Sequence, residues 1–407
     1  MSPSLFDAYV PPEDGYAGTW VGRALVPGSS GGPSVVIVQP DGVFDISRHV
    51  ATVSALLDLP DPVSFLRTLP ADRRLGAPEE LLRNSDPAER RASRPWLLAP
   101  TDLQAIKAAG VTFASSLLER VVEEQARGNP ALADEVRAAL TAQIGVDLSR
   151  VKPGSVEAEA LRAALVERGL WSQYLEVGIG PDAEIFTKAQ PGSAVGYGET
   201  VGLHPKSSWN NPEPEIVLAV SSAGAIVGAT LGNDVNLRDF EGRSALLLSK
   251  AKDNNASTAI GPFLRLFDET FTLDDVRAAD IVLRVEGADG YVVEGISSMS
   301  RISRDPAELV AETLNRSHQY PDGVVLFLGT MFVPTKERAK DDEQGGGGFT
   351  HKEGDLVVIR ARQLGTLVNR VGRSDRAPEW TLGTRALMEN LLARGLIEAA
   401  VRPALRA

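Results

Sequence analysis

The chain contains no cysteine, only four histidines and no long apolar run. Without cysteine there is no disulfide framework, no thiolate nucleophile and no zinc site built on sulfur. The longest apolar runs, such as residues 324–328, are far too short to cross a bilayer. Residues 1–15 lack the basic and apolar regions of a signal peptide, so we expect a cytoplasmic protein.

Basic residues are also fewer than acidic residues. Against 54 aspartates and glutamates there are 42 lysines and arginines, which gives a formal net charge of -12. This balance disfavours nucleic-acid binding, which needs a basic surface. It also repels an anionic substrate at long range, so that a keto-acid substrate would need a cation within the site itself.

The composition changes near residue 170, from mixed segments to β-type sequence with frequent glycine. Apolar residues at helical spacing predict helices over three segments of the first part, residues 101–125, 132–144 and 156–166. Residues 60–100 are expected to be irregular surface. We predict an α+β chain with a mixed N-terminal region (residues 1–170) and a β-rich catalytic region (residues 171–407).

The most informative segment is residues 209–234, WNNPEPEIVLAVSSAGAIVGATLGND. Glu213 and Glu215 are two apart in a β-prone run, so their side chains leave the same face of the strand. A turn at residues 223–224 would bring Asp234 opposite Glu213. Three converging carboxylates repel one another, and an all-oxygen site suits Mg²⁺, or alternatively Mn²⁺, better than Zn²⁺. The alternative, a solvated strand face, is disfavoured by the prolines and apolar residues around these glutamates.

Several short sequence motifs occur in a characteristic order along the chain. EPEIVL is followed by GNDVNLRD, then by Lys252 nine residues before Gly261-Pro262, and later by LGT and by GD ahead of VVIRARQLGTLVNRV. In these features the chain resembles the fumarylacetoacetate hydrolase superfamily over roughly residues 181–371. The resemblance implies a catalytic domain of rolled β-sheets and a homo-oligomer.

Other phrases are similar to the sugar-acid dehydratase branch of that superfamily, among them LLAPTDLQAIKAAGVTFASSLLERVVEE and AEIFTKA. Members of this branch convert 2-keto-3-deoxy-pentonates to 2-oxoglutarate semialdehyde in pentose catabolism. The resemblance therefore implies a Mg²⁺-dependent hydro-lyase. In that reaction a C3 proton leaves to form a metal-stabilised enolate, and the C4 hydroxyl is then lost.

The resemblance implies two catalytic residues, Glu184 and Lys252. Glu184 is the predicted base, because Ile185 and Phe186 would raise its pKa by desolvation. The alternative is a glutamate on the solvent side of a strand. Lys252 is the predicted cation beside the substrate, although it could instead cap a helix C-terminus, and Lys250 is a second candidate for the same role.

Three further residues are candidates for substrate binding. Thr330 would hold the substrate carboxylate with its hydroxyl or with nearby backbone N–H groups, or would only cap a strand. Lys188 matches a lysine of the superfamily, and the alternative is a surface residue near the site. Phe186 would form a wall of the pocket or pack in the core. Arg238 and Asp239 are expected to form a structural ion pair.

No histidine occurs between His49 and His204. Hydrolases and decarboxylases of the superfamily typically use a Glu-His pair upstream of the metal strand, so this gap favours dehydration. His204 is a candidate for the site, and His318 and His351 are expected at the surface or in loops. A metal-dependent hydrolase or decarboxylase of acylpyruvate- or oxaloacetate-like acids and a non-catalytic keto-acid binding protein remain the alternatives.

The glycine-rich stretch at residues 336–349, KERAKDDEQGGGGF, lacks the Gly-Lys-Ser/Thr of a phosphate-binding loop. We therefore expect a flexible surface loop, with a lid over the active site as the alternative.

Overall fold

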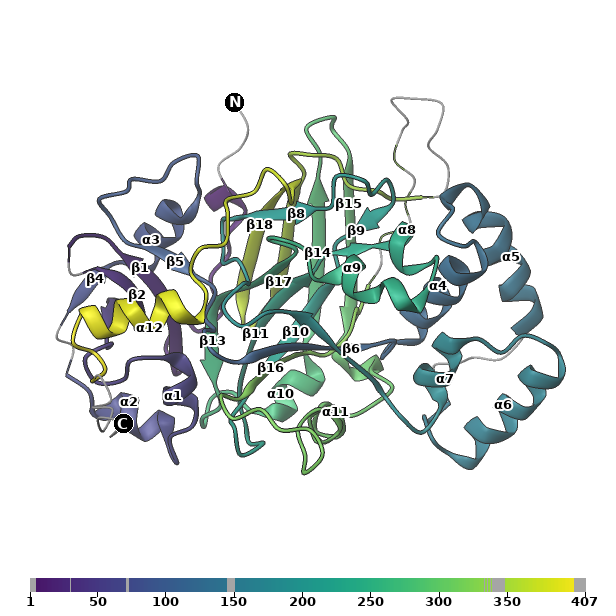
Figure 1. The fold of residues 1–407 in the computed structure, drawn as a ribbon, viewed down its shortest axis with the longest axis horizontal. Helices are drawn as coiled ribbons and strands as arrows, with labels where there is room; N and C mark the ends of the chain where they lie inside the picture. Colours follow the sequence, from purple (N-terminus) through teal and green to yellow (C-terminus); the bar gives the residue numbers. More distant parts are fainter. Residues whose placement is uncertain are drawn as a thin grey trace, which may run out of the picture.

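The computed structural model of the protein describes residues 5–29, 31–70, 73–144, 151–332, 334, 336, 338 and 348–398. Figure 1 shows a central body of β-strands, a smaller N-terminal lobe on its left and a group of helices on its right. Helices and strands both contribute substantially, which confirms the predicted α+β class. No helix within the described parts of the chain is long and apolar enough to cross a membrane.

The helices are α1 Val53–Leu57, α2 Pro62–Thr68, α3 Pro78–Ser85, α4 Ala114–Gln125, α5 Ala133–Ile144, α6 Val156–Glu167, α7 Gln173–Ile179, α8 Arg238–Glu241, α9 Leu248–Lys252, α10 Leu273–Ala278, α11 Pro306–Thr313 and α12 Thr384–Ala393. Short 3₁₀ turns occur at η1 Leu5–Ala8, η2 Pro130–Leu132, η4 Ala245–Leu247 and η5 Met299–Arg301.

The strands are β1 Trp20–Val26, β2 Gly32–Gln39, β3 Gly42–Asp45, β4 Arg74–Gly76, β5 Trp96–Leu98, β6 Ala105–Gly110, β7 Glu184–Ala189, β8 Thr200–Leu203, β9 Asn210–Asn211, β10 Pro214–Val220, β11 Ile226–Asp234, β12 Asn236–Leu237, β13 Thr258–Leu266, β14 Asp280–Glu286, β15 Val292–Ser298, β16 Val324–Phe327, β17 Leu356–Ala361 and β18 Gly365–Arg373.

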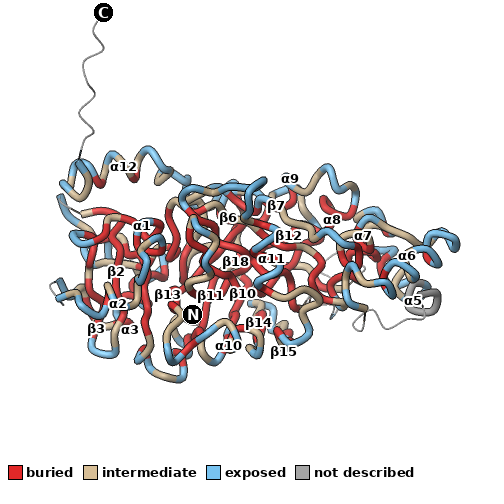
Figure 2. The backbone as a smooth tube through the Cα atoms, turned by 90° about the horizontal axis from the view of Figure 1, so that it is seen from below, coloured by how far each residue is buried: buried red, intermediate tan, exposed pale blue. Residues whose placement is uncertain are grey.

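One long sheet runs through the molecule in the order β4-β3-β2-β1-β13-β11-β10-β16-β6-β7, with β5 paired to β1. A five-stranded sheet, β15-β14-β17-β18-β8, packs against its centre, where β10 contacts β14 and β11 contacts β17. The residues between the two sheets are apolar and buried, for example Leu218, Leu231, Leu283 and Leu367. In Figure 2 this buried core occupies the middle of the molecule.

The long sheet takes strands from both sides of residue 170, since β1 pairs with β13 and β6 pairs with β16. On the left in Figure 1, α1 and α2 cover the outer part of the sheet over a second apolar cluster that includes Val35 and Leu56. Helix α12, from the C-terminal part of the chain, lies against β2 in the same lobe. The predicted boundary between two regions at residue 170 rests on the change in composition alone and stays a prediction.

Helices α4 to α7 form the group on the right of Figure 1, around an apolar cluster that includes Leu117, Val121, Leu165 and Leu175. The predicted helices at residues 132–144 and 156–166 are confirmed to within one residue at each end. Helix α4 packs against α5, α7 and α8.

The predicted helix at residues 101–125 is correct only for its second half. Ala105–Gly110 (β6) is a strand, parallel to β16 and antiparallel to β7. Its alanines favour a helix locally, but pairing on both sides supplies backbone hydrogen bonds that override this preference. Residues 60–100 are likewise not irregular, because they contain α2, β4, α3 and β5. Most of the predicted loop at residues 336–349 lies outside the described residues.

Candidate active site

The β10–β11 hairpin brings three carboxylates together as predicted. Pro214 pairs with Asn233, Glu215 with Gly232, and the Asp234 backbone N–H donates to the Glu213 carbonyl over 3.0 Å. One carboxylate oxygen from each of Glu213, Glu215 and Asp234 lies within 4.8 Å of the others, and all three residues are buried. The pairing register therefore determines this cluster, and the fold buries it.

Two lysines neutralise part of the negative charge. Lys252 Nζ lies 2.6 Å from Glu213 Oε2 and 3.1 Å from Asp234 Oδ2. Although burial opposes its charge, Asp234 and Glu213 raise the pKa of Lys252 above its ordinary value, so that it remains an ammonium group. Lys188 Nζ lies 3.1 Å from Asp234 Oδ1. Lysine 250, the second candidate for the catalytic role, is exposed.

The two glutamates titrate in opposite directions. Burial opposes ionisation of Glu213, but the charges of Arg120 and Lys252 outweigh it and lower the pKa of Glu213 to about 2. Glu215 accepts hydrogen bonds from Gly329 N (2.7 Å) and Thr330 Oγ1 (3.2 Å) but pairs with no cation among the described residues. Burial, reinforced by the charges of Asp234 and Glu213, raises the pKa of Glu215 well above its ordinary value.

A hard divalent cation fits this set of ligands. The three side chains offer only oxygen atoms, they are close enough to share one ion, and Glu215 pairs directly with no protein cation among the described residues.

Strand β7 presents three of the predicted site residues on one face, because side chains alternate along a strand. Glu184 and Phe186 line the cleft beside the triad, whereas Lys188 is fully buried next to Asp234. Lys188 Nζ donates to the carbonyls of Lys252 (2.7 Å) and Ser257 (3.0 Å). Lys188 thus holds the loop after α9 in place, and a contact between Lys188 and substrate stays a prediction.

Glu184 has room in the cleft because the residue paired with it is glycine. In the register of β6 and β7, Glu184 lies opposite Gly110, and a Cβ atom at position 110 would lie only 1.9 Å from Glu184 Oε2. Burial raises the pKa of Glu184, and the carboxylates of Glu213 and Asp234 oppose its ionisation further. A raised pKa is suitable for a general base that works near neutral pH.

One cleft collects most of the predicted site. Its lining residues are Ala109, Gly110, Val111, Ser116, Arg120, Glu184, Phe186, Glu213, Glu215, Asp234, Glu241, Lys252 and Thr330. All three predicted metal ligands, both predicted catalytic residues, Phe186 and Thr330 are in this list. Residues 180–372, which contain these seven, match the family described as fumarylacetoacetate (FAA) hydrolase C-terminal. The match extends over a little under half of the chain.

Two curated relatives are similar to about half of the chain. The 2-dehydro-3-deoxy-D-arabinonate dehydratase of Saccharolobus solfataricus is 32% identical over 188 residues, which cover 46% of this chain and 58% of the relative. A Haloferax volcanii protein named "Probable 2-keto-3-deoxyxylonate dehydratase" is 30% identical over 205 residues, 50% of this chain and 65% of the relative. The chain therefore matches less than two thirds of the length of either relative.

Solved structures share the fold over a longer stretch. One is a 2-keto-3-deoxy-D-arabinonate dehydratase complexed with magnesium and 2,5-dioxopentanoate. The structural alignment covers 87% of this chain and 99% of the dehydratase chain, with a TM-score of 0.56 and 21% sequence identity. The apo form of the dehydratase gives a TM-score of 0.57 at the same identity and coverage. This likeness confirms the predicted fold of FAA hydrolase type.

Charged side chains from two helices also line the cleft, and these residues were not among the predicted site residues. Arg120 on α4 lies outside the matched FAA hydrolase segment, yet one of its Nη atoms directly contacts Glu213 Oε1. Its other Nη atom lies 2.7 Å from Glu123 Oε2 and 3.1 Å from Glu241 Oε2. The sequence did contain an indication of these buried charges. Arg120 and Glu123 fall on the apolar face of α4 near Val121, where a charged side chain is costly unless it is paired.

A second arginine, in the segment that matches the FAA hydrolase family, anchors α4. Arg238 Nε lies 2.7 Å from Glu123 and its Nη2 lies 2.9 Å from Glu119, and the guanidinium group stacks over the Trp209 ring. The predicted ion pair between Arg238 and Asp239 is therefore wrong. Adjacent residues at the start of a helix point in different directions, and the Asp239 carboxylate instead accepts hydrogen bonds from two serines of the preceding loop, Ser207 and Ser208.

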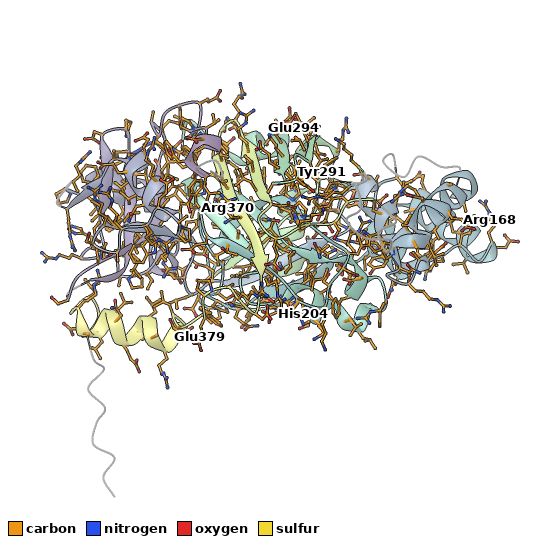
Figure 3. The ribbon with its side chains drawn as sticks, turned by 90° about the horizontal axis from the view of Figure 1, so that it is seen from above. Arg168, His204, Tyr291, Glu294, Arg370 and Glu379 are labelled. Carbon is orange, nitrogen blue, oxygen red and sulfur yellow. The ribbon has the colours of Figure 1, made fainter. Side chains whose placement is uncertain are left out.

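The histidines lie away from the cleft. His204 packs its ring against Phe240, with 5.2 Å between ring centroids, near the lower edge of the molecule in Figure 3. His351 lies in a loop, one of the two predicted alternatives, but it is buried rather than at the surface, and its Nδ1 lies 3.1 Å from Asp355 Oδ2. No histidine is among the residues that line the cleft within the described part of the chain.

Proposed function

We propose that this chain is a Mg²⁺-dependent hydro-lyase that dehydrates a 2-keto-3-deoxy-pentonate to 2,5-dioxopentanoate, which is 2-oxoglutarate semialdehyde. The observation that carries this proposal is one cleft containing both a buried carboxylate triad and, apart from it, Glu184 with a raised pKa. Support also comes from the names of the two curated relatives and from the magnesium and 2,5-dioxopentanoate bound to the similar structure.

Glu213, Glu215 and Asp234 would hold the cation, Mg²⁺ or alternatively Mn²⁺. The ion would supply Lewis-acid stabilisation for the negative charge that develops on the 2-oxo group of the substrate. The protein contributes Lys252, which holds Glu213 and Asp234 in position and adds a positive charge to the otherwise acidic cleft. Thr330 fixes Glu215, and Phe186 forms an apolar wall.

Glu184 is the proposed base that removes the C3 proton. Its raised pKa keeps the proton affinity of its carboxylate high, and Gly110 leaves the space that the side chain needs. Only ionised Glu184 can accept the proton, so the rate should rise with pH until Glu184 is ionised.

A hydrolase or decarboxylase acting on acylpyruvate- or oxaloacetate-like acids is the alternative reaction on this fold. It would be favoured by a histidine over the triad, and none lines the cleft among the described residues. A non-catalytic keto-acid binding protein would keep the triad but show no dependence on Glu184.

The test is a proton NMR assay of 2-keto-3-deoxy-pentonate with Mg²⁺ and with EDTA, using the wild type, Glu184→Gln and Glu294→Gln. Glu294 is an exposed glutamate on β15, labelled in Figure 3, and serves as the matched control. We expect 2,5-dioxopentanoate only with Mg²⁺, and a loss of about 100-fold or more in Glu184→Gln alone. A folded, metal-binding wild type that leaves the pentonate intact but consumes acylpyruvate or oxaloacetate would contradict the proposal.

A further inference from the structure

The cleft contains more proton-carrying groups than a single base, but most of them are already engaged. Lys252 bonds to Glu213 and Asp234, and Thr330 donates its hydroxyl proton to Glu215. Ser116 donates to the carbonyl of Phe113 over 2.9 Å. Arginine does not lose its proton in proteins, which excludes Arg120 as an acid. Apart from the three proposed metal ligands, two carboxyl groups remain among the described residues that line the cleft, those of Glu184 and Glu241.

Glu241 reaches the cleft from the last residue of α8, and it is buried, with 4% of its surface exposed. Its Oε2 atom forms an ion pair with Arg120 Nη1 over 3.1 Å, although the N–H groups of Arg120 are not directed at it for a hydrogen bond. Arg120 is shared with Glu123 and Glu213, so that one cation serves three buried carboxylates. Glu241 thus differs from Glu213, which pairs with both Arg120 and Lys252.

The proposed elimination needs a second proton-transfer group. Hydroxide is a poor leaving group, so the C4 oxygen must receive a proton as its bond to carbon breaks. We propose that Glu241 donates this proton, as a catalytic general acid distinct from the base Glu184, while Arg120 positions the Glu241 carboxyl group. This inference rests on the proposed dehydration.

The step balances with these two residues alone. Glu184 takes the C3 proton, the C3–C4 double bond forms, and the C4–O bond breaks with its electron pair on oxygen. Glu241 protonates this oxygen, and water leaves. Ionised Glu241 then removes a proton from C5, the double bond moves to C4–C5, and Glu184 returns its proton to C3. The resulting C5 enol tautomerises to the aldehyde, and both glutamates end in their starting states.

The charges around Glu241 agree with this role. Burial raises the pKa of Glu241 to about 7, opposed by Arg120 on α4 and Lys252 on α9 and reinforced by Glu123 and Glu213. Tyr174 on α7 also interacts electrostatically with Glu241, which raises the pKa of the buried Tyr174 hydroxyl further. Because the acid must be protonated, the Glu241-dependent step should slow as the pH rises above about 7.

The test compares 2-keto-3-deoxy-pentonate with its 4-fluoro analogue, since fluoride leaves as a stable anion and needs no proton. We expect Glu241→Gln to lower kcat/KM for the 4-hydroxy substrate by about 100-fold or more and to change fluoride release little. Mg²⁺ affinity, measured by calorimetry, should remain that of the wild type. Glu241→Asp, which keeps the acid on a shorter side chain, should recover part of the loss.

Glu123→Gln is the matched control, because it removes the other carboxylate from the same Arg120 nitrogen but lies outside the cleft lining. It should affect both substrates alike. Equal losses on both substrates in Glu241→Gln would instead make Glu241 a purely structural partner of Arg120 and overturn the inference.

The wild type provides a check that needs no variant to fold. Its ratio of fluoride release to dehydration should increase as the pH is raised through about 7. A ratio independent of pH would overturn the role of Glu241 while leaving dehydration intact. A wild type that does not dehydrate the pentonate at all would overturn the proposed function itself, so that the two failures are distinguishable.

Discussion

The two sides of the cleft are built in different ways. On one side, the β10–β11 hairpin places Glu213, Glu215 and Asp234 through local register, with a short turn between the strands. On the other side, Arg120, Glu123 and Glu241 come from α4 and α8, more than a hundred residues apart in the chain. The hairpin side carries excess negative charge ready for a cation, whereas the helical side is a network of paired charges. The comparison shows that one site can combine a locally encoded part and a part assembled only by packing.

The largest expected effect is on the hairpin side. Asp234→Asn removes one of three ligands and leaves Lys188 and Lys252 with one anion fewer. We expect loss of Mg²⁺ binding by calorimetry and a decrease in dehydration of about 1,000-fold or more, because the metal contributes several kcal/mol to stabilising the developing charge. The exposed Asp375→Asn is the control. Full Mg²⁺ affinity in Asp234→Asn would show that the triad is not the metal site.

The helical side should respond in stability rather than in metal binding. Arg238→Met leaves Glu119 and Glu123 without a shared buried cation, and we expect it to lower the free energy of unfolding by about 3–5 kcal/mol. Denaturant unfolding measures this change. Arg284→Met, which breaks the exposed pairs with Glu286 and Glu294, should cost only about 0–1 kcal/mol. Equal costs in the two variants would mean that the network does not anchor α4.

A glycine substitution tests the strand that supports the base. Gly110→Ala forces a Cβ atom into the position of Glu184 Oε2, so that the carboxyl group must turn away. We expect dehydration to decrease about 100-fold, with Mg²⁺ affinity retained, because general base catalysis contributes about that much. Gly383→Ala, where the nearest heavy atom lies 3.7 Å away, controls for the substitution itself. Undiminished activity in Gly110→Ala would count against Glu184 as the base.

The smallest effect concerns proton release on the hairpin side. Because burial raises the pKa of Glu215, part of its population is protonated at acidic pH, and Mg²⁺ must displace that proton. Affinity for Mg²⁺ should therefore weaken as the pH falls, and calorimetry in two buffers of different ionisation enthalpy should detect proton release. In Glu215→Gln the proton release should disappear. Binding that is independent of pH in the wild type would contradict the raised pKa.

Much of the site could be predicted from local patterns. The alternation of Glu213 and Glu215, the turn and the position of Asp234 all depend on residues within one hairpin, where period and register are nearly sufficient. The same holds for Glu184, Phe186 and Lys188, whose two-residue spacing places them on one face of β7. Local patterns failed at β6, where an alanine-rich segment became a strand because two neighbouring strands supply its hydrogen bonds.

The sequence by itself therefore determined the fold class, the carboxylate triad and the identity of the base and lysine candidates. Only the tertiary structure decided that Lys252 rather than Lys250 enters the site, that Lys188 is enclosed behind it, and that Arg120 and Glu241 complete it. The physical reason is distance along the chain. Side-chain direction within a hairpin follows from backbone geometry, whereas the partner of a buried charge depends on which helix packs against it.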